Sequence, residues 1–244
     1  LYLFNHLVLY LFLFNFPYFY KNYYLNIRYK SLIILKHKLN MIIKEFFWGA
    51  ILNILAISDV HGNENNKLYS YLNDNKIDLL IVSGDITNFG PVDFVEYFIN
   101  KLSEYGTEIF AIPGNCDPDG VERKIIDSNA VCIHNTVIEY ENLVLYGFGG
   151  SNPTPFDTPG EFDEDTFYKS IKAVLESKNI DSVKEPTDEF PHGKIPILVT
   201  HAPPKDTEAD KIADGSHVGS EAIRRIIEEY KPSLNICGHI HEAM

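Results

Sequence analysis

The chain has 244 residues, of which 45% are hydrophobic and 23% charged, so it can bury a complete globular core. Its formal net charge is −13 although residues 1–48 are basic, and this acidic balance argues against sequence-independent binding to long nucleic acid. Three cysteines without a CxxC pair argue against a disulfide framework or a structural zinc site and favour a reduced, cytoplasmic setting: Cys116, Cys132 and Cys237.

The first fifty residues differ from the rest. Residues 1–20 are apolar or aromatic except at Asn5, His6, Asn15 and Pro17. The segment is almost long enough to span a membrane, but it lacks the pattern of a signal peptide. The segment is rich in Leu, Phe, Tyr, Asn, Ile and Lys, a composition that A+T-rich codons produce. We therefore interpret residues 1–50 as upstream sequence or a fragment, with the mature protein starting at Met41 or near Leu52. A genuine membrane anchor is the alternative.

Residues 51–244 are predicted to form the functional domain, and its first half alternates strands and helices. Continuous apolar runs end in polar residues at 51–59, 77–85 and 107–115. Amphipathic stretches at 63–75 and 92–104 separate these runs. This alternation predicts an α/β fold whose sheet is covered on both faces.

The second half begins with short strands at 130–135, 136–141 and 143–150, followed by a Pro-rich loop at 151–162. The remaining predicted elements are a helix at 163–177, a loop at 179–194, a strand at 195–203, a helix at 220–230 and a strand at 233–241. The chain stops just after the last strand, so we expect the domain to be truncated at its C-terminus.

Polar side chains with metal-binding chemistry follow five of the apolar runs: Asp59, His61, Asp85, Asn115, Cys116, Asp117, His201, His239 and His241. The carboxyl ends of parallel strands share one crevice, so we expect these side chains to meet. Carboxylates, imidazoles and a carboxamide suit Mn²⁺, Fe, Zn²⁺ or Ni²⁺. The set is too large for one ion, whereas two ions about 3.5–4 Å apart that share a carboxylate would use it. Any single aspartate, taken alone, is as well explained as a helix cap.

The stretches "DVH", "GD", "GNCD", "THAP" and "GHIH" resemble the motif series of the calcineurin-like metallophosphoesterase superfamily, across residues 52–241. Neighbouring stretches such as "GFGGSNPTPFDTP" are similar to its Icc-related branch. The resemblance implies a four-layer αββα sandwich, here truncated at its C-terminus. It also implies that a hydroxide activated by two metal ions, Mn²⁺ above all, attacks phosphorus.

Carried over residue by residue, the resemblance implies one metal site formed by Asp59, His61, Asp85 and His241. It implies a second site formed by Asp85, Asn115, His201 and His239, with Asp85 shared between the two ions. In the same comparison Asp117 occupies an acidic position that orients neighbouring groups, and Asp85 and Asn115 also count as catalytic residues.

Cys116 stands where the superfamily has a histidine credited with protonating the leaving group. A thiol carries no positive charge and donates weakly, so it cannot replace that imidazole. We interpret Cys116 as a packing residue and name His217 as the candidate replacement acid. The alternative is that His217 is a loop histidine without a role.

Within the Pro-rich loop, Asn152 and Phe156 are candidate substrate contacts, with simple loop packing as the alternative. The predicted function is hydrolysis of phosphodiesters or small nucleotides. The expected partner is a small phosphoester, without long nucleic acid, and without a membrane unless the N-terminal segment is genuine. The rival hypothesis is a non-catalytic binding scaffold of the same fold, which the lost histidine favours and the complete ligand set opposes.

Overall fold

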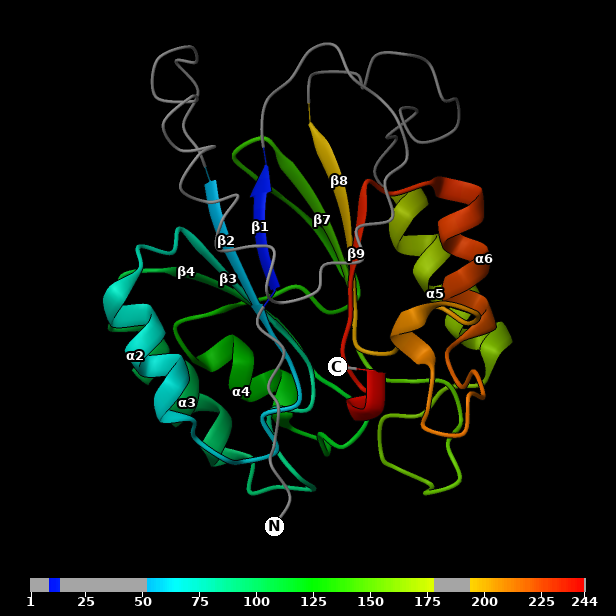
Figure 1. Cartoon of the computed structure of the whole chain (residues 1–244), viewed down its shortest axis with the longest axis horizontal. Helices are drawn as coiled ribbons and strands as arrows, with labels where there is room; N and C mark the ends of the chain where they lie inside the picture. Colours follow the sequence, from blue (N-terminus) through cyan, green and yellow to red (C-terminus); the bar gives the residue numbers. More distant parts are fainter. Residues whose placement is uncertain (1–8, 14–51, 178–193, 244) are drawn as a thin grey trace.

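The computed structural model describes residues 9–13, 52–177 and 194–243, and two β-sheets form its centre (Figure 1). The first sheet has the order β1-β2-β3-β4-β5 and the second β6-β7-β8-β9. The strands of the first sheet are β1 (Leu9–Leu13), β2 (Leu52–Ile57), β3 (Leu79–Ser83), β4 (Glu108–Ile112) and β5 (Val131–Cys132). Those of the second are β6 (Thr136–Tyr140), β7 (Leu143–Phe148), β8 (Ile195–Thr200) and β9 (Leu234–Ile236).

The strands that precede the polar motifs are parallel within each sheet. In the first sheet Ile57 lies beside Val82, and Ser83 lies beside Ile112. In the second sheet Val199 lies beside Ile236. Because the registers match, the carboxyl ends of these strands lie at one edge of each sheet.

Helices cover the outer face of each sheet, which gives four layers (Figure 1). The helices are α2 (Asn66–Asp74), α3 (Asp93–Ser103), α4 (Val121–Asp127), α5 (Glu164–Ser177) and α6 (Glu221–Tyr230). The first three pack on the first sheet and the last two on the second. A third apolar core, which includes Ile81 and Ile197, joins the inner faces of the two sheets. The predicted α/β sandwich of αββα type is confirmed.

Two helices differ from the prediction. The predicted helix at 63–75 begins only at Asn66, because the Asn65 side chain accepts a hydrogen bond from the Lys67 N–H and caps the helix there. The segment before this cap is a loop that leads away from the strand end. Helix α4 is absent from the predicted elements because seven residues are too few for a clear periodicity.

Most of residues 1–50 and of the loop predicted at 179–194 lie outside the described residues. Within the first fifty, β1 pairs antiparallel with β2 at the edge of the first sheet. The interpretation of this segment as upstream sequence stays a prediction. None of the helices in the described ranges has the length and apolar character needed to cross a membrane.

Candidate metal centre

All seven predicted metal ligands lie just beyond strand ends: Asp59, His61, Asp85 and Asn115 from the first sheet, and His201, His239 and His241 from the second. Three overlapping groups of side chains among the described residues place their ligand atoms within 4.8 Å of one another. They are Asp59 with His61 and His241, Asp85 with His201 and His239, and His61 with Asp85 and Cys116. The tertiary structure therefore brings the two halves of the motif series together.

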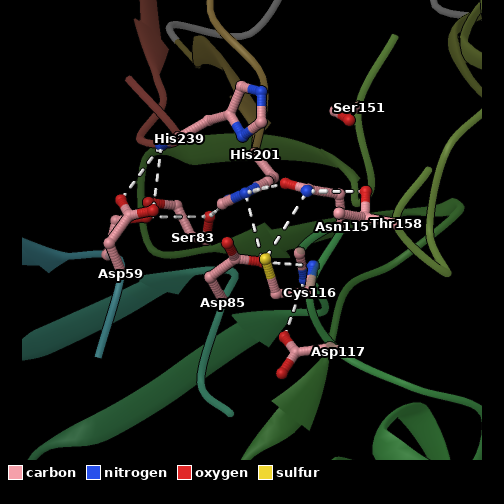
Figure 2. A network of polar contacts seen from close by, with 12 residues as sticks. Asp59, Ser83, Asp85, Asn115, Cys116, Asp117, Ser151, Thr158, His201 and His239 are labelled. Carbon is pink, nitrogen blue, oxygen red and sulfur yellow. Dashed lines mark hydrogen bonds and ion pairs between the residues drawn. The ribbon is translucent and has the colours of Figure 1, made fainter. Parts of the chain in front are cut away.

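The group around His201 has the spacing of a coordination shell. His201 Nε2 lies 2.9 Å from Asn115 Oδ1 and 3.3 Å from Asp85 Oδ1 (Figure 2). Two ligand atoms about 2.1 Å from one ion and at right angles to each other would be about 3.0 Å apart. On its other side His201 Nδ1 lies 2.8 Å from the Ser83 carbonyl oxygen. A hydrogen bond there leaves the Nε2 lone pair directed at the site.

The group around His61 is built in the same way. His61 Nε2 lies 3.1 Å from His241 Nε2, and His241 Nε2 lies 3.3 Å from Asp59 Oδ1. Asp85 connects the two groups, because its Oδ1 faces His201 while its Oδ2 lies 3.7 Å from His61 Nε2. One carboxylate thus presents a different oxygen to each group.

Histidines supply the positive charge that faces the two buried carboxylates of the site. Asp59 and Asp85 are buried, and within the described ranges their ion-pair partners are His61, His201 and His241 rather than Lys or Arg. Burial alone would raise the pKa of Asp85, but the charge of His201 outweighs it and holds that pKa well below its usual range. Asp85 thus depends on a protonated histidine for its positive partner, and a divalent metal ion could supply that charge instead, so this arrangement fits a bound metal ion.

The histidines of the second group differ in protonation. Burial would lower the pKa of His201, but the Asp85 carboxylate raises it to about 9. Burial and the nearby charge of His201 lower the pKa of His239 to about 4. Without metal, His201 therefore holds the proton at neutral pH and His239 is neutral.

We expect the affinity for Mn²⁺ to rise with pH, because Nε2 of His201 must lose its proton to bind an ion. The apparent affinity should increase by up to about tenfold per pH unit and level off above pH of about 9. Calorimetry in two buffers with different heats of ionisation should detect more than one proton released per chain at pH 7, because the bond with Asp59 also raises the pKa of His241. His134→Asn is the control, since His134 lies outside these groups and burial already lowers its pKa. An affinity that stays constant between about pH 6.5 and 8.5 would contradict the expectation.

The backbone is held in a rarely adopted conformation at four of the seven residues. The φ angles are 57° at Asp59, 49° at His61, 50° at Asp85 and 73° at His239. This left-handed region is uncommon for residues other than glycine, and such strain gathers at functional sites. We infer that the fold holds these side chains in place at a cost in local stability.

Asp117 joins the two loops that carry Asp85 and Asn115. Its buried carboxylate accepts hydrogen bonds from the N–H groups of Gly114 at 2.8 Å and Thr87 at 2.7 Å. It also accepts one from the Ile86 N–H at 3.1 Å. The Thr87 hydroxyl donates to the same carboxylate at 2.9 Å. These contacts tie the two loops together, and the predicted role of Asp117 in orienting neighbouring groups stays a prediction.

Cys116 lies against the carboxylate of Asp85. Its N–H donates to Asp85 Oδ1 at 2.8 Å, and burial together with the charge of Asp85 raises the pKa of its thiol well above the usual range. A protonated thiol is a poor nucleophile. The interpretation of Cys116 as a packing residue stays a prediction, and its thiol also belongs to the group with His61 and Asp85.

The other candidates lie outside the three ligand groups. His217 Nδ1 is 2.7 Å from Oδ1 of the buried Asp210, and Asn152 Nδ2 donates to the Val218 carbonyl oxygen at 3.2 Å. Phe156 is 80% exposed. The assignments of His217, Asn152 and Phe156 stay predictions.

Two residues that contact the candidate residues could not be identified from the sequence, namely Thr158 and Asp210. Thr158 Oγ1 accepts a hydrogen bond from Asn115 Nδ2 at 2.8 Å, which turns Asn115 Oδ1 towards His201 (Figure 2). The carboxylate of Asp210 lies within hydrogen-bond distance of one ring nitrogen of His217. Thr158 is distant in sequence from Asn115, and the bond between Asp210 and His217 depends on how their loop folds, so only the folded structure identifies these contacts.

With this geometry established, comparison with known proteins identifies the family. The sequence profile of the calcineurin-like phosphoesterase family matches residues 52–243. The chain belongs to this family. Calcineurin-like phosphoesterases are hydrolases of phosphoesters that bind divalent metals, and the three groups of side chains are candidate ligands for them.

Individual relatives agree with the family. The chain is 38% identical over 199 residues to the uncharacterized protein MJ1162 of Methanocaldococcus jannaschii, covering 79% of this chain and 81% of the relative. A shorter match, 41% identical over 51 residues and 21% of each chain, is to a probable cyclic nucleotide phosphodiesterase, XBJ1_0953, of Xenorhabdus bovienii. The crystal structure of TT1561 of Thermus thermophilus superposes with a TM-score of 0.54 at 17% identity, covering 75% of this chain and 80% of that one. At that identity it supports the fold alone.

Proposed function

We propose that this calcineurin-like phosphoesterase is a two-metal phosphodiesterase for small phosphodiesters, including nucleotides, with Mn²⁺ as its preferred ion and the cytoplasm as its setting. One observation carries the proposal. Asp85 Oδ1 faces His201 and Asp85 Oδ2 faces His61, so a single carboxylate lies between two groups of ligand atoms. A carboxylate in this position can join two ions about 3.5–4 Å apart.

The donor set fits such a pair of ions. Asp59, His61, Asp85 and His241 would hold the first, and Asp85, Asn115, His201 and His239 the second. When bound, the ions would act as Lewis acids that neutralise phosphoryl oxygens and lower the pKa of water at the site. This supply of positive charge suits a chain whose body is acidic and whose site contains no paired Lys or Arg among the described residues.

Contacts within the protein orient the candidate ligand side chains. The Ser83 carbonyl fixes the ring of His201, and Thr158 fixes the amide of Asn115. Asp117 ties the loops after β3 and β4 together. Such outer contacts typically change metal affinity or activity by about 10–100-fold when removed.

The residue at position 116 favours diesters with good leaving groups, which can depart without first receiving a proton. The neutral thiol of Cys116 lies beside Asp85, where it cannot supply a positively charged acid. If His217 acts as the acid, Asp210 occupies its Nδ1 and the proton leaves from Nε2. The name of the Xenorhabdus relative agrees with a diesterase over the short segment matched.

The rival proposal is a non-catalytic scaffold, which the replacement of the usual histidine by Cys116 favours. The buried carboxylates and the four strained backbone positions oppose it, since a scaffold gains nothing from them.

Metal-dependent hydrolysis separates the two proposals. We expect the full chain, stripped with chelator and reloaded with Mn²⁺, to bind two ions and to hydrolyse bis(p-nitrophenyl) phosphate faster than p-nitrophenyl phosphate. Metal analysis counts the ions, and absorbance follows the reaction. Two bound ions without hydrolysis of either ester would support the scaffold.

A further inference from the structure

Two exposed phenylalanines lie on loops beside the metal centre. Among the described residues the strongly exposed large hydrophobic side chains are Phe89, Tyr97, Ile126, Phe156 and Val218. Phe89 is 58% exposed and Phe156 is 80% exposed. A single exposed apolar residue needs no explanation, so the places where these two rings are held matter more than their exposure.

Phe89 is fixed to the turn that contains Cys116. It follows Asp85 by four residues, and its N–H donates to the Cys116 carbonyl oxygen at 3.0 Å. Its φ angle of 60° lies in the left-handed region, which is uncommon for a bulky residue. The loop therefore holds an exposed aromatic residue next to the turn that contains Cys116, although its backbone conformation is unfavourable.

The loop that carries Phe156 is bonded to the same turn through two residues that follow Phe156, namely Thr158 and Gly160. Gly160 N–H donates to the Asn115 carbonyl oxygen at 3.0 Å, and Thr158 accepts from the Asn115 side chain. Glu161 Oε1 accepts hydrogen bonds from both the N–H and the hydroxyl of Thr158, at 2.9 and 2.7 Å. The loop that carries Phe156 is thus internally braced, and it meets the turn 115–116 to which Phe89 is also bonded.

We propose that Phe89 and Phe156 bind the planar base of a nucleotide whose phosphate lies at the metal centre. This inference rests on the proposed function and specifies its substrate class. Metal ions would hold the phosphate, and the base would extend to the rim of the site, where two rings offer stacking faces. Stacking on aromatic side chains recognises every base, because each has a π face. Rings on braced loops suit a rigid, planar group better than a flexible chain.

Binding of three phosphate esters to the Mn²⁺-loaded full chain tests this inference by calorimetry. Adenosine 5′-monophosphate carries a base, ribose 5-phosphate lacks it, and hexyl phosphate replaces it with an apolar chain. We expect the nucleotide to bind about tenfold more tightly than ribose 5-phosphate. The double variant Phe89→Leu/Phe156→Leu should lose that difference and keep its affinity for ribose 5-phosphate. Tyr97→Leu removes an exposed aromatic ring of α3 and should leave all three affinities unchanged.

The outcomes distinguish this inference from the proposed function. Equal affinities for the nucleotide and ribose 5-phosphate in the unaltered chain would overturn the inference, as would hexyl phosphate binding as tightly as the nucleotide. Diester hydrolysis combined with either result would leave the phosphodiesterase proposal standing. A tenfold preference for the nucleotide in a chain that hydrolyses no diester would instead overturn the proposed function alone.

Discussion

Metal-dependent hydrolysis is expected to disappear when Asp85 is replaced by asparagine. Asp85 faces both groups of ligand atoms, so Asp85→Asn weakens both candidate sites at once. Loss of about 4 kcal/mol of electrostatic stabilisation corresponds to a fall in kcat/KM of roughly 10³-fold. The measurement is hydrolysis of bis(p-nitrophenyl) phosphate at saturating Mn²⁺, together with the number of ions bound.

The control for this prediction is Asp93→Asn. Asp93 is an exposed residue at the start of α3 whose carboxylate pairs with Lys124, and a surface pair of this kind contributes little. The fold of the Asp85→Asn protein should persist, because an asparagine oxygen can still accept the Cys116 N–H. Full activity of folded Asp85→Asn protein would rule out Asp85 as the shared ligand.

Gly114→Ala is expected to damage both stability and metal binding. A Cβ at Gly114 would lie less than 3.0 Å from the carboxylate and the main-chain nitrogen of Asp85. Main-chain atoms cannot move aside easily, so the overlap should lower the free energy of unfolding by about 3 kcal/mol. For a chain of this size that is a fall of about 10 °C in Tm. Displacing Asp85 should also weaken Mn²⁺ binding by about 10–100-fold.

Gly106→Ala separates this overlap from an ordinary loss of glycine. Gly106 has a φ of 72° and nothing within 4 Å of an added Cβ, so the substitution should cost only about 1 kcal/mol of backbone strain. Thermal unfolding without metal and calorimetry with Mn²⁺ measure the two effects. The expectation fails if both variants lose equal stability and bind Mn²⁺ equally well.

Much of the candidate site could be predicted because its ligand residues lie close together in the sequence, directly after recognisable strands. Asp59 and His61 are two positions apart after one strand, and His239 and His241 repeat that spacing after another. Such pairs follow apolar runs that are recognisable as buried strands. The structure brings all four of these residues into the ligand groups, while their binding of metal stays a prediction.

Other features had no local signal. Nothing in the residues around Phe89 singles it out, because its exposure depends on a hydrogen bond to Cys116 and on an unusual φ angle. His217 could be named as a histidine near His201, but its bond to Asp210 depends on how the segment after β8 folds back on itself. Burial and main-chain bonding, unlike residue type, are properties of the assembled structure.

The sequence by itself determined the α/β class, the strands and the types of ligand that follow them. Strand periodicity and residue chemistry act over a few positions, so they can be read without a partner. Only the tertiary structure decided that the edges of the two sheets meet, that Asp85 presents one oxygen to each group, and that Thr158 turns Asn115 towards His201. These contacts join segments far apart in the chain, and their geometry is set by the packing of one sheet on the other.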